Sequence, residues 1–454
     1  MTLIYKKISG IPAIGIFGHV GNQNLGDEAI IAAVIQNIRL RYPGAQICGF
    51  TINPADTAER HKIRAFPIRR QKVRALHQDN EDVNESGSIS STVAHRITGA
   101  LKSVPVVAGF LRGLLRTCHA VLGVPAELKF LLRAYHNLTG VDLLIIAGSQ
   151  QLIDYVGGPW AFPYTIFKWV LLAKLAKTNV AFVSVGAGPI HSPLGKFFAR
   201  ASLRLSSYCS FRDESSRSFI ETLGVSGENA VFPDLAYSLE VDSPSTLTVA
   251  PDSRPVIGIN PVPFSDENYW LGANAHQYEI YIGKLADFAL RAIQRGYRIL
   301  FFPTQLYLDP PVISDIEKQM IAKADKSLTQ HLMPNRILSF ADLVAAICMT
   351  DIVLAARFHG IVIPYILNRP VLGIAYQRKT VDLMAQMGQS EFVVDINSFD
   401  VASLETRLLL IESRSATIKE QINHKKSLFR KLLLQQYDQV FNLVPCHSYP
   451  ARAA

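Results

Sequence analysis

Cysteine is scarce in this 454-residue chain and never occurs in closely spaced pairs. The five cysteines are Cys48, Cys118, Cys209, Cys348 and Cys446. A disulfide framework or a thiolate zinc site needs cysteines at short, regular spacings, so the sequence indicates neither. Such scarcity is typical of proteins of a reducing compartment, and we expect a cytoplasmic location.

Long hydrophobic runs are also missing. No segment reaches the roughly 18 uninterrupted apolar residues that a membrane span needs. The amino-terminal segment, Lys6-Lys7 followed by ISGIPAIGIFGHV, has the charge of a weak signal peptide. Glycines and a proline interrupt its apolar run, however, and no small-residue cleavage site follows, so we predict a first β-strand there. The sequence therefore favours a soluble or peripheral protein.

Neither of the common phosphate-binding motifs follows this first strand, which we place at Ala13 to Phe17. The loop from Gly18 to Gly26 lacks both the GxGxxG spacing and the GK[ST] sequence of a P-loop. Its glycines and asparagines still permit a sharp turn close to a ligand, and Asp27 suits the start of a helix. From these residues alone, a structural loop and a ligand-binding loop both remain open.

Positive charge is abundant, in contrast. The formal net charge is +9 and the pI is about 9.2, which favours acidic ligands, nucleic acid or an anionic membrane surface. We expect no nucleic-acid partner, because no recognised binding motif or aromatic stacking pattern accompanies the charge. Hydrophobic residues make up 49% of the chain, enough for two cores.

Strand-like and helix-like segments alternate in two series, which predicts an α/β fold with two parallel sheets. The first domain covers residues 1–240, and a basic insertion occupies about 56–139. A segment rich in Ser, Thr, Pro and Asp, residues 241–255, is typical of a linker. The second domain covers 256–400, and a helical tail, 401–454, follows it.

The basic insertion contains cationic residues among leucines, valines and phenylalanines. Arg112, Arg116, Lys129 and Arg133 recur as they do in helices with one apolar and one cationic face. One interpretation is a pair of helices on a membrane surface, in peripheral contact with the inner membrane. The other is burial of the apolar face against the first domain.

Polar and cationic residues follow the predicted strands, and in open α/β sheets that edge binds ligands. Arg212 comes after the strand Tyr208 to Phe211, and Arg357-Phe358-His359 come after the strand Asp351 to Leu354. Each position also begins a helix, whose free N–H groups and positive dipole end attract anions. The alternative for Arg212 is a salt bridge to Asp213 or Glu214, and for Arg357 and His359 an ordinary surface turn.

Six motifs in this order resemble those of the polysaccharide pyruvyl transferases. They are Gly21-Asn22-Gln23-Asn24-Leu25-Gly26-Asp27-Glu28, Gly186-Ala187-Gly188-Pro189, Phe211-Arg212-Asp213, Pro233-Asp234, Arg357-Phe358-His359-Gly360 and Tyr376-Gln377-Arg378-Lys379. The resemblance implies two Rossmann-like domains in a GT-B arrangement with the active site in the interdomain cleft. It also implies transfer of pyruvate from phosphoenolpyruvate to two hydroxyls of a sugar, which forms a cyclic ketal.

Residue roles follow from this resemblance and from the chemistry. We predict that His359 is the general acid, and that Arg212 and Arg357 hold the carboxylate and phosphate of phosphoenolpyruvate from opposite domains. Lys379 adds a phosphate contact. Substrate contacts are also predicted for two residues of the first loop, Asn24 and Asp27. Asp27 or Asp234 would orient the acceptor, although a helix cap explains either equally well.

No cofactor and no metal ion are expected. The acceptor is predicted to be a sugar of a polysaccharide or of a lipid-linked oligosaccharide.

The chain departs from the family where a run of glycines usually follows the third strand. Here the residues are Gly148-Ser149-Gln150-Gln151, whose side chains would narrow the cleft or bind a sugar. Two other functions stay open. A GT-B glycosyltransferase would use a nucleotide sugar and an acidic ribose-binding residue, for which Glu391 lies in the right region. A non-catalytic carbohydrate-binding protein would keep only the fold.

Overall fold

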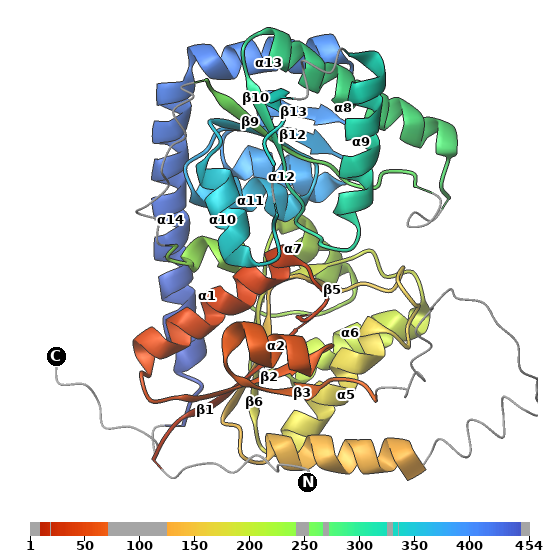
Figure 1. Ribbon diagram of the computed structural model, residues 1–454. Coiled ribbons are helices and arrows are strands. Elements are labelled where there is room, and N and C mark those ends of the chain that lie inside the picture. Colours follow the sequence, from red (N-terminus) through yellow and green to blue (C-terminus); the bar gives the residue numbers. More distant parts are fainter. Residues whose placement is uncertain are drawn as a thin grey trace, which may run out of the picture.

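A computed structural model describes residues 10–18, 20–70, 125–241, 254–266, 272–324, 330–334 and 336–445. Within these residues the chain forms two α/β units, each built on a parallel sheet with helices on its faces (Figure 1). Most of the predicted basic insertion and nearly all of the predicted linker lie outside the described residues.

The first unit contains an eight-stranded sheet in which every strand pair is parallel. Its strands are β1 (Ala13–Phe17), β2 (Gln46–Thr51), β3 (Arg64–Pro67), β4 (Leu143–Ala147), β5 (Gln150–Leu152), β6 (Asn179–Ala187), β7 (Tyr208–Phe211) and β8 (Ala230–Val231). The order is β3-β2-β1-β4-β6-β7-β8, with β5 paired to β6. The order reverses between β1 and β4, so a crevice for ligands is expected beyond their carboxyl ends.

Helices cover both faces of this sheet. They are α1 (Leu25–Arg41), α2 (Pro54–His61), a helix at 125–138, α5 (Phe162–Leu175), α6 (Pro193–Leu205), α7 (Glu214–Thr222) and the 3-10 helix η2 (Leu235–Ser238). Successive strand residues point to opposite faces, so one set packs with α1 and the other with α5. Ile14 and Ile16 lie in the same hydrophobic core as the buried residues of α1, whereas Phe17 packs with Trp169 of α5.

The second unit contains a five-stranded parallel sheet in the order β10-β9-β11-β12-β13. The strands are β9 (Val256–Asn260), β10 (Arg298–Phe301), β11 (Ile352–Ala355), β12 (Val371–Ala375) and β13 (Val393–Asp395). Its helices are α8 (Ala275–Gln294), α9 (Asp309–Lys323), α10 (Phe340–Cys348), α11 (Phe358–Ile366), α12 (Arg378–Gln386) and η4 (Ser390–Phe392). Here the order reverses between β9 and β11, and Arg357 and His359 come directly after β11.

The structure corrects the boundary of the predicted insertion. Residues 56–67 were assigned to it, but α2 and β3 occupy this region and extend the first sheet. The sequence pattern hides β3 because the strand is short and partly exposed, and begins with the exposed Arg64. Helix α1 also starts at Leu25 rather than at Asp27, because the Asn24 side chain caps it by accepting from the N–H of Gly26.

The carboxyl-terminal helices are α13 (Val401–Ser413) and α14 (Ser415–Phe441). Figure 1 shows α14 running along the side of both units. Near its start, Gln421 accepts a hydrogen bond from Gln389, and Lys426 donates to the carbonyl of Ile366 in the second unit. Near its end, Gln436 contacts Ser184 and Ser210 of the first sheet. One helix therefore ties the two units together.

The loops that face each other across the cleft are joined by main-chain hydrogen bonds. The N–H of Leu25 donates to the carbonyl of Thr304 at 2.8 Å, and the N–H of Leu306 donates to Gln23 at 3.0 Å. Asn24 and Gln305 thereby form an antiparallel bridge. The start of α1 is held in register with the loop that follows β10.

No helix among the described residues is both long and apolar enough to cross a bilayer.

The contact between α14 and the first sheet can be tested at Gln436, which is fully buried. Its amide accepts from Ser184 Oγ at 3.2 Å and donates to Ser210 Oγ at 2.7 Å. We expect Gln436→Leu to lower the free energy of unfolding by about 1–3 kcal/mol, because two buried hydroxyls lose a partner. The neighbouring Gln435 is exposed. Gln435→Leu is the control and should leave the thermal midpoint unchanged; equal midpoints for both variants would contradict this assignment.

Candidate functional site

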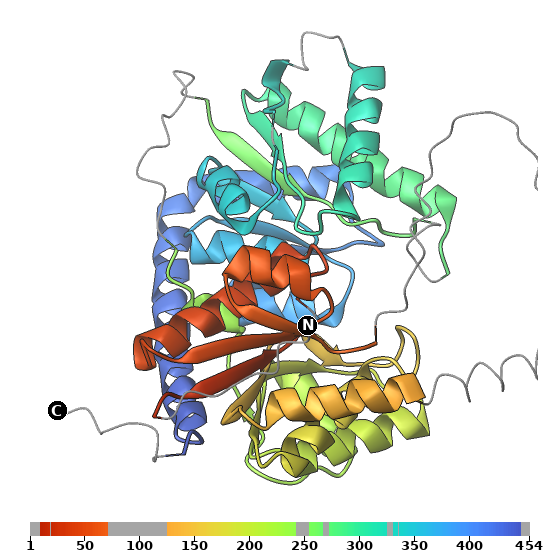
Figure 2. The ribbon, with the colours of Figure 1, turned by 60° about the horizontal axis from the view of Figure 1, so that its bottom comes forward.

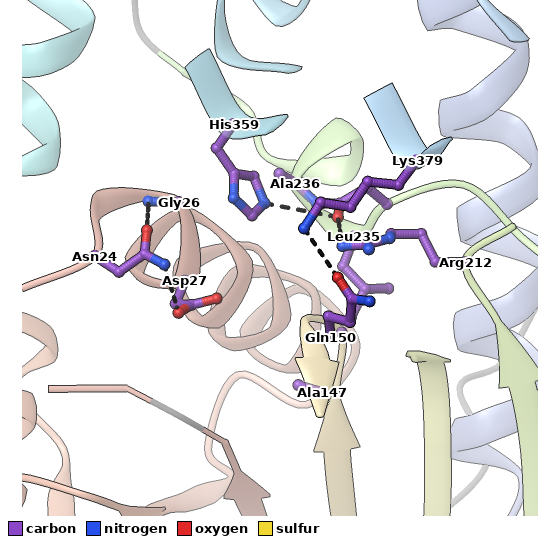
Figure 3. Close-up of polar contacts among 12 residues, drawn as sticks. Asn24, Gly26, Asp27, Ala147, Gln150, Arg212, Leu235, Ala236, His359 and Lys379 are labelled. Carbon is purple, nitrogen blue, oxygen red and sulfur yellow. Dashed lines mark hydrogen bonds and ion pairs between the residues drawn. The ribbon is translucent and has the colours of Figure 1, made fainter. Parts of the chain in front are cut away.

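His359 lies at the interface of the two units, as the second residue of α11. Its ring packs against Gly26 at the start of α1, so closely that a Cβ added to Gly26 would lie 2.1 Å from Nδ1. Its Nε2 is 3.6 Å from Oδ2 of Asp234, the residue that caps η2. Figure 3 shows the imidazole between the start of α1 and Leu235-Ala236. The glycine is required because the other domain's imidazole fills the place of a side chain.

The carboxyls on the two sides of this imidazole differ in their ionisation. Burial raises the pKa of Asp27, and the opposing effects of His359 and a hydrogen bond from Ser149 do not cancel that shift. Burial would also raise the pKa of Asp234, but hydrogen bonding and charge from His359, with the charge of Arg212, lower it to about 2. Asp234 is therefore an anion at neutral pH, while Asp27 is the more readily protonated of the two.

Arg212 follows β7 and is 5% exposed. Its guanidinium stacks on the ring of Phe358 at 4.2 Å, with Nη1 3.5 Å from Asp234 Oδ2 and Nε 3.7 Å from Asp213 Oδ2. The contact with Asp213, which was the alternative interpretation for Arg212, is therefore present, and substrate binding by Arg212 stays a prediction. Nε is buried without a hydrogen-bond partner. Gly186 leaves room for the group, because a Cβ there would lie 2.9 Å from Nη2.

Lys379 reaches across the cleft from the start of α12. Its Nζ donates to Oε1 of Gln150 at 2.9 Å, and the Gln150 amide donates in turn to the carbonyl of Gly188 at 2.8 Å. Burial lowers the pKa of Lys379 to about 7, helped by the charges of Arg212 and Arg357. Near neutral pH, the Lys379 side chain is therefore present in both its charged and its neutral form.

Arg357 and Asn24 are both held by protein partners. Arg357 donates from Nε and Nη2 to Oδ1 of Asp309, at 3.0 and 2.5 Å, and the other oxygen of Asp309 accepts from the N–H groups of Thr304 and Gln305. Burial works to lower the pKa of Arg357, but Asp309 outweighs it and raises that pKa. Asn24 caps α1 and donates to Asp27 at 2.8 Å. Substrate contacts by Arg357, Asn24 and Asp27 remain predictions.

A cavity of about 540 Å³ opens between the two units beside these residues. Arg212 and Lys379 line it, whereas His359, Arg357, Asn24 and Asp27 do not. The remaining lining residues come from both units: Gln150, Tyr155, Ala187, Gly188, Pro189, Asp213, Ser215, Ser216, Phe219, Gln377 and Arg378. The amino ends of α7 and α12 both reach this cavity, and their free N–H groups favour an anion.

Three lining residues escaped a functional assignment from the sequence. Ser215 is the second residue of α7 and donates to Asp382 of the second unit at 2.7 Å. Arg378 belongs to the last of the quoted motifs, which was the available signal for it. Tyr155 sits in a loop after β5 and carries no sequence signal. The described part of the chain contains no group of three or more His, Cys, Asp or Glu side chains that could hold a metal ion.

A family model named polysaccharide pyruvyl transferase matches residues 24–378. The chain belongs to this family. It is 21% identical over 421 residues to the amylovoran biosynthesis protein AmsJ of Erwinia amylovora, an alignment that covers 89% of this chain and 93% of AmsJ.

Solved structures of other activities share the fold of this pyruvyl transferase family member. The UDP-GlcNAc 2-epimerase of Neisseria meningitidis matches with a TM-score of 0.54 at 11% identity. This match covers 95% of this chain and 100% of the epimerase chain. A glycosyltransferase from Rickettsia africae matches with a TM-score of 0.54 at 10% identity, covering 96% and 99%. The predicted GT-B arrangement of two Rossmann-like domains is confirmed.

Glu391, the residue considered for ribose binding in a glycosyltransferase, is engaged elsewhere. Its carboxylate accepts from Arg414 at 3.2 Å, and its carbonyl accepts from Arg407 at 3.1 Å. Both arginines belong to the carboxyl-terminal helical region. Glu391 is not among the residues that line the interdomain cavity.

The close approach of His359 to Gly26 gives a direct test of this site. We expect Gly26→Ala to displace the imidazole, to lower turnover, and to lower the free energy of unfolding by about 1–3 kcal/mol, because the added methyl overpacks a buried interface between the domains. Gly283→Ala in α8 is the control, since its Cβ would meet only the flexible end of Gln319 at 3.3 Å. Full activity of Gly26→Ala would contradict the assigned position of His359.

Proposed function

We propose that this protein transfers pyruvate from phosphoenolpyruvate to two hydroxyls of a sugar, in a polysaccharide or its lipid-linked precursor, and forms a cyclic ketal. The observation that carries the proposal is the convergence of Arg212 and Lys379, from opposite domains, on one cavity, with His359 close to the same Asp234 carboxylate that Arg212 contacts. Membership in the family supports the same reaction, and the name of AmsJ supports a role in polysaccharide synthesis.

The donor carries two anionic groups, and the cavity offers two kinds of positive group. In this proposal, Arg212 binds one of them through its planar guanidinium, which suits carboxylates and phosphates alike. When the donor binds, Nζ of Lys379 gives up its hydrogen bond to Gln150 and donates to a phosphate oxygen instead. The amino ends of α7 and α12 supply N–H donors to the same anion. Arg357, fixed to Asp309, adds positive potential without leaving its partner.

The chemical steps begin with a proton transfer. His359 gives a proton to the methylene carbon of phosphoenolpyruvate, and the neighbouring carbon becomes an oxocarbenium-like centre. One sugar hydroxyl attacks it and loses its proton. The C–O bond to phosphate then breaks, and the second hydroxyl attacks to close the ketal. Of the two hydroxyl protons, one restores His359 and the other leaves on phosphate. Every step is a proton transfer or a change of C–O bonds, so we propose no cofactor.

The acidic residues take separate parts in this scheme. Asp234, an anion 3.6 Å from Nε2, holds the imidazole in place across the domain interface. Asp27, whose pKa is raised, is suited to accept the proton of a sugar hydroxyl. The acceptor would enter along Gln150 and Tyr155, which line the cavity. We also propose a cytoplasmic location, which the lack of paired cysteines supports.

Incubation of purified protein with phosphoenolpyruvate and candidate lipid-linked or nucleotide-linked sugars tests the function. We expect phosphate release that needs both substrates, with a ketal carbon detected by NMR in the sugar product. His359→Ala should lower turnover by ~10²–10⁴-fold and leave donor binding by calorimetry nearly intact. His276→Ala, at an exposed position of α8, is the control. Turnover supported only by a nucleotide sugar would overturn the proposal.

Donor affinity should depend on pH through Lys379. Its pKa of about 7 means that the ammonium is mostly charged at pH 6 and mostly neutral at pH 8. Donor affinity supplied by this group is therefore present below pH 7 and is lost as the pH rises through 7. We expect the dissociation constant measured by calorimetry to rise up to tenfold per pH unit above 7.

Lys379→Arg keeps its charge across this range, and the donor's own ionisation affects both proteins equally. The difference between their profiles isolates Lys379, and parallel profiles would show that Lys379 does not bind the donor.

A further inference from the structure

Three helices form a layer on the face of the first sheet that lies away from α1. In this layer the helix at 125–138 packs beside α5, and α5 packs beside α6 (Figure 2). Lys168 of α5 ties the first two helices, with Nζ 3.3 Å from Glu127 and 4.8 Å from the ring centre of Phe130. Phe167 of α5 stacks on Phe198 of α6, with their ring centres 5.2 Å apart. The inner side is a buried core that includes Trp169.

The outer side of this layer is rich in apolar groups. Trp160, two residues before the start of α5, is 63% exposed, Leu175 is 62% exposed and Phe197 is 50% exposed. The exposed large hydrophobic residues of the layer are Leu128, Leu132, Trp160, Leu171, Leu175, Leu194 and Phe197. Exposed apolar side chains gathered on one layer of helices are typical of an interaction site.

The charge of the layer is nearly all positive. Its exposed bases are Lys129, Arg133, Lys174, Lys177, Lys196, Arg200 and Arg204. In the three helices 125–138, α5 and α6, the sole acidic residue is Glu127, which is paired with Lys168. Helix α9 is different, since Lys318 and Lys323 each have an acidic partner, in Asp315 and Asp287.

We propose that this helix layer binds the surface of an anionic lipid bilayer. Exposed Trp, Phe and Leu side chains among lysines and arginines are the composition of helices that lie in a membrane interface. The apolar groups would enter the boundary between headgroups and acyl chains, while the bases would contact lipid phosphates. Protein interfaces are poor in lysine by comparison, which favours lipid over a protein partner.

The layer is also connected to the interdomain cavity. The loop before α5 carries Tyr155, which lines the cavity, and five residues later Trp160 at the edge of the layer. A lipid-linked acceptor held in the bilayer could therefore present its sugar at the cavity while the protein stays docked. This last step rests on the proposed function, whereas membrane binding itself does not.

Vesicle flotation of the full-length protein tests the proposal without substrate. We expect binding to vesicles of phosphatidylcholine with phosphatidylglycerol, weak binding to phosphatidylcholine alone, and a decline with salt. Lys174→Ser/Lys196→Ser/Arg200→Ser should lower the partition coefficient on the order of 100-fold, at roughly fivefold per base. The control with the same net charge, Lys318→Ser/Lys323→Ser/Lys431→Ser, should bind as the wild type does. Equal loss in both variants would overturn the proposal by showing that only net charge matters.

Two further measurements identify the surface that binds. Lipids brominated near the headgroup should quench tryptophan fluorescence in the wild type and far less in Trp160→Phe. A second triple variant, Lys102→Ser/Arg112→Ser/Arg116→Ser, removes charge from the segment that precedes the layer. Loss of binding in this variant together with wild-type binding of the helix-layer variant would assign the membrane contact to that segment and refute our proposal. Thermal midpoints equal to the wild type establish that each variant is folded.

Discussion

The buried carboxylate of Asp234 is the constraint on which the cleft depends. Its charge is sequestered from water and therefore costs several kcal/mol unless cations surround it. Its partners come from both domains, the guanidinium of Arg212 from the first and the imidazole of His359 from the second. Phe358 completes the contact by stacking on Arg212. The position of the imidazole is thus tied to the relative placement of the two sheets, and a shift of either domain would leave the carboxylate with too few partners.

Much of this framework could be predicted from the sequence, because it follows from local patterns. Strands β1 and β7 occupy their predicted ranges, and β11 lies within one residue of its predicted range. The rule that ligands bind at the carboxyl ends of parallel strands placed Arg212 at the ligand-binding edge of the first sheet and His359 at that of the second. Short strand β3 was assigned to an insertion, because four partly exposed residues carry no apolar run.

The partners of the predicted site residues could not be read from the chain. Asp309 lies 48 residues before Arg357, and nothing in its surroundings marks it as the group that engages that guanidinium. Gly26 was read as a residue of a flexible turn, whereas its small size is needed because His359 of the other domain packs on it. Such pairings arise only when the two domains are docked, so they depend on tertiary contacts that sequence periodicity does not encode.

The main-chain bridge between residues Gln23–Leu25 and Thr304–Leu306 bears on how the cleft is used. A net contribution of about 1 kcal/mol per hydrogen bond means that separating the loops costs about 2 kcal/mol, so the bridge alone makes a separated form roughly 30-fold rarer than the joined one. Exchange of substrate and product would proceed mainly through the mouth of the cavity near Tyr155, with α14 and the bridge holding the two domains in one mutual orientation throughout a catalytic cycle.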